Sequence, residues 1–264
     1  MSIVIDRTEV DSDRSPIVLW DNLFSQGTLA ASTESTDGEK ENAVDGTTYD
    51  FWTPTALPAT LSVTLGSGAP ASYVGIAAHD LFTGGCTVAV EYYSGGWVEL
   101  ATVTPTDNKT LIIAFDETTA TQFRLYITGT TPPSIGVAFI GDVVRFDTGI
   151  LPAYTPIAYS DEIELLNSQT MNGQFITNRA NMVGAKTNVN LNILDRTFVE
   201  GSDFQSFRNY YNLGNPFFFA SNPSELDFDV AYCWRQKGGE IKPTFSNNGI
   251  FYTTSMSLEA YVGT

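Results

Sequence analysis

The alternation of apolar and polar residues along the chain predicts a protein built almost entirely from β-strands. Leu61, Val63 and Leu65 alternate with polar neighbours, and the segment 188–193 follows the same period of two. This period places one face of a strand against a core and leaves the other face in water. The final run repeats the pattern over a longer stretch, with one side formed by Ile250, Tyr252, Thr254, Met256, Leu258, Ala260 and Val262.

Other segments complete a β-rich pattern. Gly95-Gly96 is typical of a two-residue hairpin turn, because glycine tolerates the positive φ angles that such turns require. Residues 216–220 are almost wholly apolar, which predicts a buried strand. Further strands are predicted at 87–92, 111–115, 123–128 and 137–146.

One short helix is expected in the second half of the chain. Phe204, Phe207 and Tyr211 recur at helical spacing, and Ser202 to Gln205 has the spacing of a capping box. Gly214 follows at a position where a glycine can end a helix. The fold class is therefore predicted to be all-β with a single helix.

The length of 264 residues favours two domains, since one domain commonly holds about 100 to 200 residues. The stretch 148–156 carries two prolines and is interpreted as the linker between them. The predicted organisation is an N-terminal arm at 1–20, a β-sandwich at 21–148 and a second β-rich assembly domain at 149–264. The arm is expected to add a strand to either domain or to a neighbouring molecule.

Charge argues against nucleic acid as a partner. The chain has 13 Lys plus Arg against 30 Asp plus Glu, a formal net charge of −17, and such a surface repels polyphosphate.

Cys86 and Cys233 fall in different predicted domains, so a disulfide between them is not expected. No basic stretch precedes a long apolar run, and no segment approaches the about 18 apolar residues that a membrane span needs. Synthesis in a host cytoplasm without membrane insertion is the expectation.

The first half carries a series of short sequence markers. In chain order they are Ala30-Ala31-Ser32, Asn42-Ala43-Val44-Asp45-Gly46, Trp52, Leu61-Ser62-Val63-Thr64-Leu65-Gly66, Val90-Glu91-Tyr92-Tyr93-Ser94, Trp97, Phe123-Arg124-Leu125-Tyr126-Ile127-Thr128-Gly129 and Ile140-Gly141-Asp142-Val143. This series resembles the discoidin-type, galactose-binding-like β-sandwich family. The resemblance implies a jelly-roll β-sandwich that binds a ligand and seldom catalyses a reaction.

The resemblance also implies a candidate structural calcium site. In the sugar-binding branch of the family, an Asp-Gly turn before a tryptophan and an acidic residue on the last strand help to hold calcium. Asp45 lies in such a turn, and Asp142 lies on the expected last strand. Asp50 stands where that branch usually has threonine. Oxygen ligands suit this hard cation, although Asp45-Gly46 is equally interpretable as a plain turn beside a solvated acidic loop.

The same family binds sugars through aromatic residues in loops and through an arginine or a histidine. His79, Phe82 and Trp97 are the candidates for these roles, because aromatic ring faces stack on the apolar face of a pyranose. The alternative interpretation places Trp97 in the core. His79 is the only histidine, so a catalytic relay or a multi-histidine metal site has at most one candidate member.

Sequence motifs for catalysis are lacking. The chain has no phosphate-binding glycine loop, Cys-x-x-Cys or His-Glu-x-x-His motif, and no cofactor is implied. Carboxylates are plentiful, and a glycosidase needs only a suitably placed pair, so counting does not exclude that class. We expect a protein that is not an enzyme.

The second half combines a strand at 188–194, a helix-like stretch at 198–211, Asn215-Pro216-Phe217-Phe218-Phe219, Cys233-Trp234-Arg235 and a closing strand at 252–262. This general pattern resembles the β domains of phage distal and minor tail proteins. The leading hypothesis is therefore a structural component of a phage virion in the tail or tail tip, forming a homo-oligomeric ring with other virion proteins. Its outward module would contact host surface glycans. The alternatives are a stand-alone carbohydrate-binding protein and an accessory domain of a glycan-active hydrolase.

Overall fold

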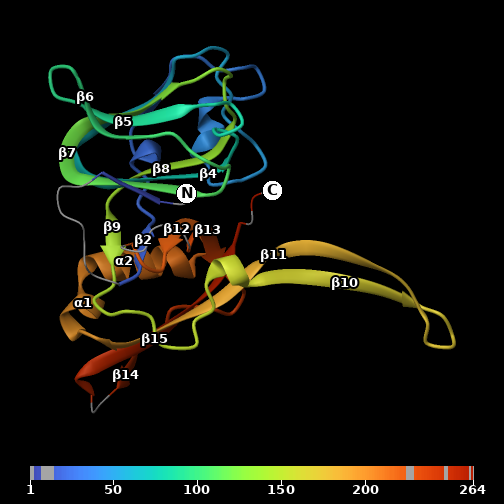
Figure 1. The fold of residues 1–264 in the computed structure, drawn as a ribbon. Coiled ribbons are helices and arrows are strands. Elements are labelled where there is room, and N and C mark those ends of the chain that lie inside the picture. Colours follow the sequence, from blue (N-terminus) through green and yellow to red (C-terminus); the bar gives the residue numbers. More distant parts are fainter. Residues whose placement is uncertain (1–2, 7–14, 224–228, 247–248, 262, 264) are drawn as a thin grey trace.

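The computed structural model describes residues 3–6, 15–223, 229–246, 249–261 and 263. Within them, most of the chain forms two large, mainly antiparallel sheets, accompanied by two short α-helices and three 3₁₀ turns (Figure 1). The predicted all-β class is confirmed, with a sandwich followed by a second sheet. The 3₁₀ turns are η1 (Leu23–Ser25), η2 (Lys40–Ala43) and η3 (Ile157–Tyr159).

The first sheet folds over on itself to form a sandwich. Its strands are β1 (Ile3–Asp6), β3 (Thr28–Ala31), β4 (Ala59–His79), β5 (Thr87–Tyr93), β6 (Trp97–Val103), β7 (Leu111–Thr128) and β8 (Ile135–Gly141). The long strands β4 and β7 pair along their whole length and continue from one layer into the other. The first part of β4 and the last part of β7 belong to the outer layer, where they pair with β3 and β5 respectively. The last part of β4 and the first part of β7 belong to the inner layer, next to the second sheet, where they pair with β8 and β1 respectively. The 111–115 and 123–128 segments, predicted as two strands, are therefore the two ends of one bent strand.

The first core lies between the two layers of this sandwich. Alternate residues of each strand enter it, as the sequence predicts for Leu61 and Val63. Trp52, Phe24, Phe115 and Phe123 are its largest members, and each is fully buried. Trp52 donates its indole N–H to the carbonyl of Thr33, 3.2 Å away, so its one polar group is satisfied.

The second sheet collects strands from both ends of the chain. Its order is β10 (Asp161–Gln169), β11 (Phe175–Leu194), β15 (Phe251–Ala260), β13 (Val230–Arg235), β12 (Phe217–Ala220), β2 (Ile17–Leu19) and β9 (Val143–Arg145), and β14 (Thr244–Ser246) pairs with β15. The strands predicted at 188–193, at 216–220 and at the C-terminal end are confirmed. Val262 lies outside the described residues.

Two helices, not one, cover the second sheet. The predicted helix is α2 (Ser202–Asn212), and its Phe204, Phe207 and Tyr211 enter a core shared with the sheet. The capping-box prediction is wrong, because Gly201 precedes the helix and no side chain caps it. The additional helix α1 (Arg196–Glu200) begins at Asp195, whose carboxylate accepts the N–H of Thr197 at 2.8 Å. Gly214 ends the region with a φ of +86°.

A third core joins the sandwich to the second sheet. On the inner layer, Val74 and Ile76 point into the sandwich, whereas Tyr73 and Ala77 point toward the second sheet. From the opposite side, Phe218 and other residues of β2, β12 and β13 complete this third core. The inner layer is thus buried on both faces, which explains its nearly unbroken run of buried residues.

Strands from the predicted arm and from the segment 143–145 are distributed between the two sheets. The predicted arm contributes β1 to the sandwich, in parallel with β7, and β2 to the second sheet. Residues 143–145, predicted as part of the first unit, form β9 and pair with β2 in the second sheet. The change of sheet falls at Asp142, between β8 and β9, and Val144 and Phe146 then enter the second core.

We expect Gly75→Ala to destabilise the protein by about 1–3 kcal/mol, the usual cost of overpacking. A Cβ at Gly75 would lie 2.6 Å from the ring of Phe218, so the two sheets would have to move apart. Gly66→Ala is the matched control on the same strand, because a Cβ at Gly66 would have no atom within 4 Å. Urea unfolding of both variants measures the difference.

The same contact predicts a specific non-additivity. Phe218→Ala alone is expected to cost about 3–5 kcal/mol through loss of a fully buried ring. In the Phe218→Ala background, Gly75→Ala is expected to cost little, because the atoms it would strike are gone. An equal cost of Gly75→Ala in both backgrounds would contradict this account of the junction.

Candidate binding site

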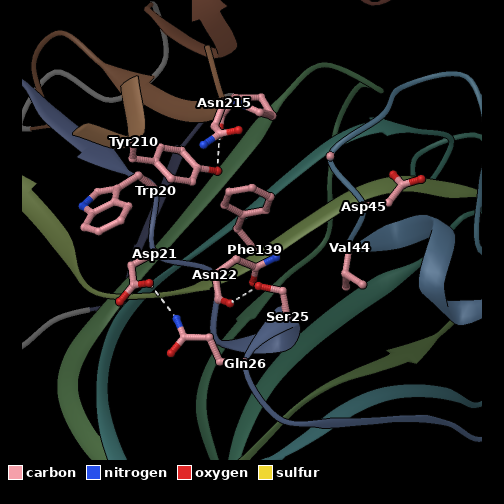
Figure 2. Close-up of a pocket in the computed structure, with 12 residues that line it drawn as sticks. Trp20, Asp21, Asn22, Ser25, Gln26, Val44, Asp45, Phe139, Tyr210 and Asn215 are labelled. Carbon is pink, nitrogen blue, oxygen red and sulfur yellow. Dashed lines mark hydrogen bonds between the residues drawn. The ribbon is translucent and has the colours of Figure 1, made fainter. Parts of the chain in front are cut away.

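A pocket opens where the sandwich meets the second sheet. It has a volume of about 410 Å³ and takes residues from both units (Figure 2). Its lining comes from the segment that follows β2, the turn that follows η2, the strand β8, the helix α2 and the turn before β12. Its lining residues are Trp20, Asp21, Asn22, Ser25, Gln26, Val44, Asp45, Gly46, Phe139, Tyr210, Asn215 and Pro216.

Asn22 fixes the segment that follows β2. Its side-chain oxygen accepts the N–H groups of Phe24, at 3.1 Å, and Ile140, at 3.2 Å, while its amide donates to the carbonyl of Ala138 at 3.1 Å. The first bond caps η1, and the other two tie the segment to β8. Trp20 and Asp21 are thereby held at the pocket by a buried polar anchor.

Aromatic side chains form one wall and the floor of the pocket. The rings of Trp20 and Tyr210 are tilted against each other with centroids 5.1 Å apart. The Tyr210 hydroxyl donates to the carbonyl of Pro216 at 2.8 Å, and Phe139 forms the floor (Figure 2). Burial, with a smaller contribution from the carboxylate of Asp21, raises the pKa of Tyr210 to about 12. The phenol is therefore neutral near pH 7.

Polar groups form the rest of the rim. Asp21 accepts a hydrogen bond of 2.6 Å from the side-chain amide of Gln26. Desolvation raises the pKa of Asp21 above its ordinary value, and the bond from Gln26 partly opposes this rise. Asp45 accepts the N–H of Thr47 at 2.8 Å. The side-chain amide of Asn215 makes no hydrogen bond within the described residues and lies beside the pocket.

A glycine allows the two sides of the pocket to approach closely. Gly46 has a φ of +86°, and a Cβ there would lie 3.1 Å from Pro216 and 3.3 Å from the hydroxyl of Tyr232. The carbonyl of Gly46 accepts a 2.7 Å hydrogen bond from that hydroxyl. The turn that follows η2 is thus fastened to the second sheet, and contacts within the fold hold this part of the pocket wall in place.

The predicted glycan residues lie elsewhere. His79 is 6% exposed, and its two ring nitrogens are hydrogen-bonded to the carbonyl of Lys109, at 2.9 Å, and the N–H of Leu81, at 3.4 Å. Burial lowers the pKa of His79 to about 4, so the ring is neutral near pH 7. Its hydrogen-bonding capacity is used within the fold.

Phe82 and Trp97 are not brought together. Phe82 is 52% exposed in the turn before β5, whereas Trp97 follows the far end of that strand. The guanidinium of Arg124 lies 4.1 Å from the centre of the Trp97 ring, and Tyr93 meets the same ring edge-on. A glycan role for Phe82 or Trp97 stays a prediction.

The three carboxylates predicted to hold calcium form no single cluster. Asp45 and Asp50 both accept hydrogen bonds from Thr47 within their turn. Asp142 instead accepts the hydroxyl of Ser72 at 2.6 Å, at the junction of β8 and β9. Among the described residues, no group of three or more His, Cys, Asp or Glu side chains is placed to hold a metal ion. Calcium binding stays a prediction without a site in this arrangement.

Two further features concern the remaining candidate chemistry. Cys86 and Cys233 are buried as free thiols, in the first and second cores respectively. Burial raises the pKa of both thiols, which holds them in the unreactive protonated form. No helix in the described part of the chain is long and apolar enough to span a membrane.

The pocket could not be predicted from the sequence. In the sequence, Trp20 is only the last residue of the predicted arm, and Tyr210 is only one residue of the predicted helix. Nothing local to either residue shows that they meet, since 190 positions separate them. The pairing of β2 with β12 is what brings them together.

No protein-family model matches the chain, and no curated protein sequence matches it. Chains of solved structures do resemble it. Chitosan-binding module 1 from a chitosanase/glucanase of Paenibacillus sp. IK-5 is 22% identical, and the match covers 46% of this chain and 99% of that one with a TM-score of 0.40. The family 32 carbohydrate-binding module of C. perfringens NanJ, in complex with galactose, is also 22% identical, with coverages of 47% and 98% and a TM-score of 0.40.

A GH29 fucosidase of Ruminococcus gnavus is 18% identical, and the match covers 47% of this chain and 27% of that one with a TM-score of 0.40. The similar structures thus include carbohydrate-binding modules at low identity. The resemblance of the second half to phage tail proteins finds no support among them. Each of these likenesses concerns less than half of this chain.

We expect stability to fall as the pH is lowered from about 6.5 to about 4. The unfolded chain binds a proton at His79 with a pKa near 6.5, whereas the folded chain does so only near 4, so the unfolded state binds more protons in this window. On account of His79, the free energy of unfolding is expected to be about 3 kcal/mol higher above about pH 6.5 than below about pH 4. Urea unfolding of the wild type and of His79→Gln between pH 7 and pH 4 isolates it.

The lone histidine also allows a direct measurement. Its ring proton resonance in an NMR titration is expected to stay at the neutral position down to about pH 5. Titration near pH 6.5 would instead show that the ring is accessible to water and contradict this account of its burial.

Proposed function

We propose that this protein binds carbohydrate through the pocket between its two sheets and does not catalyse a reaction there. The observation that carries the proposal is the juxtaposition of the Trp20–Tyr210 aromatic wall with the polar rim of Asp21 and Asn215. A sugar ring has an apolar face and a belt of hydroxyl groups. Aromatic faces bind the first, and carboxylate or amide groups orient the second.

The size and rigidity of the pocket support a small ligand. Its volume of about 410 Å³ lies within the about 300–1,000 Å³ that is usual for small-molecule sites. The wall residues are held by bonds within the fold, such as that from Tyr210 to Pro216. A ligand therefore finds most of the site already formed, which lowers the entropic cost of binding.

Charge indicates which sugars the pocket takes. Asp21 and Asp45 lie on its lining, and the whole chain carries a formal charge of −17. Anionic sugars such as uronic or sialic acids would be repelled by this field. Neutral sugars and amino sugars are the proposed ligands.

We propose binding without catalysis because both carboxylates of the pocket accept hydrogen bonds from within the fold. A glycosidase needs one carboxyl group as an acid and a second as a base or nucleophile across the scissile bond. Here Asp21 is paired with Gln26, and Asp45 orders its own turn through Thr47. The virion role, the oligomeric ring and the tail localisation remain predictions, and carbohydrate binding does not depend on them.

Substitutions at the pocket are expected to weaken binding of a neutral or amino oligosaccharide. Asn215→Ala removes an amide that has no partner within the described residues, and we expect a loss of about 5- to 10-fold, the worth of one hydrogen bond. Trp20→Ala removes the stacking face, with an expected loss of at least about 10-fold. A glycan array selects the ligand, and isothermal titration calorimetry measures the affinities.

Phe82→Ala is the matched control, since Phe82 is an exposed aromatic residue outside the pocket. It is expected to leave the affinity unchanged. Loss of binding in Phe82→Ala with full binding in both pocket variants would move the site to the turn before β5 and overturn the proposal. Release of new reducing ends from the bound oligosaccharide would overturn its non-catalytic part.

A further inference from the structure

A two-stranded ribbon projects from the second sheet. It consists of β10 and the first part of β11, and it extends well beyond the rest of the molecule (Figure 1). All 19 residues from 163 to 181 are exposed. A hairpin that packs against nothing is at best marginally stable in water. The ribbon therefore lacks, in a single copy of the chain, the contacts that would normally stabilise it.

The exposed residues of the ribbon include large apolar side chains on both faces. Leu165 and Leu166 are each 56% exposed, and as neighbours on a strand they point to opposite faces. Ile163, Met171, Phe175 and Ile176 are likewise more than half exposed. An apolar cluster of this extent on a projecting element is typical of an interaction surface.

The outer edge of the ribbon is open to strand pairing. β10 is the terminal strand in the order of the second sheet, and it is nine residues long. Natural edge strands are usually protected by lysine, by proline or by being short. β10 contains neither lysine nor proline, and its carboxylates lie near its base, although its pairing with β11 is irregular between Glu162 and Ile163 and again after Ser168. The stretch 163–168, where the pairing is regular, therefore offers its outer backbone N–H and carbonyl groups to another strand.

The distribution of charge along β10 selects a second copy of the same strand in antiparallel orientation. Its carboxylates, Asp161, Glu162 and Glu164, all lie near the base, and residues 165–178 carry no charge. If a two-fold axis passes through Leu165, or nearer to the tip, every carboxylate faces an uncharged residue of the other copy. In-register parallel pairing would instead place each carboxylate beside its own counterpart, which is unfavourable.

The uncharged stretch 165–178 also provides a place where two strongly acidic molecules can make contact. Two chains of net charge −17 repel each other over most of their surfaces. The projecting ribbon allows contact through its uncharged part, while the acidic bodies stay apart beyond the range of screened repulsion.

We propose that two copies of this protein dimerise by antiparallel pairing of β10 with β10, which joins their second sheets into one continuous sheet. The contact is isologous, because the same residues serve both copies. The contact consists of the nine residues of β10 from each copy, because the β11 part of the ribbon lies on the other side of β10. Dimerisation in this way is independent of the carbohydrate pocket.

Light scattering coupled to size exclusion, over a series of protein concentrations, tests the proposal. The chain of 28.7 kDa is expected to elute at twice that mass. The double variant Leu165→Glu/Leu166→Glu places like charges around the two-fold axis, and its dimer dissociation constant is expected to rise at least about 100-fold. Leu213→Glu, at an exposed leucine outside the ribbon, is the matched control and is expected to remain dimeric.

Hydrogen exchange supplies a second measurement that identifies the contact. Backbone amides of β10 are expected to exchange more slowly in concentrated than in dilute wild-type protein, and at one fast rate in the double variant. A wild-type chain that is monomeric at every concentration would overturn the proposal. So would a dimer that survives the double substitution, or an assembly of three or more copies.

Discussion

The packing of the second sheet onto the sandwich is the interaction on which the rest of the structure depends. Its centre is a cluster of three aromatic residues, with the ring of Phe218 5.3 Å from that of Phe139 and 4.9 Å from that of Tyr232. Gly75 leaves room for Phe218, because any larger residue there would strike its ring. The inner layer of the sandwich thereby becomes the middle of three stacked layers, with apolar cores on both sides.

The pocket is a consequence of this junction. Its lining combines the segment that follows β2, the turn that follows η2, α2 and the turn before β12, and Phe139 links its floor to the third core. The bond from Tyr232 to Gly46 connects the same core to the pocket rim. The geometry of the pocket therefore depends on the junction, since no single element forms it alone.

The sequence was informative where burial leaves a periodic signal. The strand at 188–193, the buried run at 216–220 and the helix around Phe204 and Phe207 were all predictable, because alternate or helical spacing follows from a one-sided core. The helix α1 was missed, as five residues are too few for a period to show. The ribbon of β10 and β11 was also missed, because neither of its faces is buried in one copy and so no alternation marks it.

The site residues were harder to predict for a different reason. His79 is the only histidine and attracted a functional interpretation, yet its environment neutralises the ring and occupies both nitrogens. The partner of one ring nitrogen, the carbonyl of Lys109, lies 30 positions away in the sequence and so leaves no local signal. Trp20 and Tyr210 carry no local motif at all, and they become a site only through long-range strand pairing.

The position of β2 has a consequence for how the protein is made. Ile17 pairs with Arg145 and with Ala220, which follow it by 128 and 203 positions. On the ribosome, this early segment emerges long before either neighbour exists. The sandwich strands between them can close first, but the apolar side chains of β2 must wait in solution until most of the polypeptide has been synthesised. Such late closure slows folding and exposes an adhesive segment in the meantime, so premature termination of translation would release chains prone to aggregate.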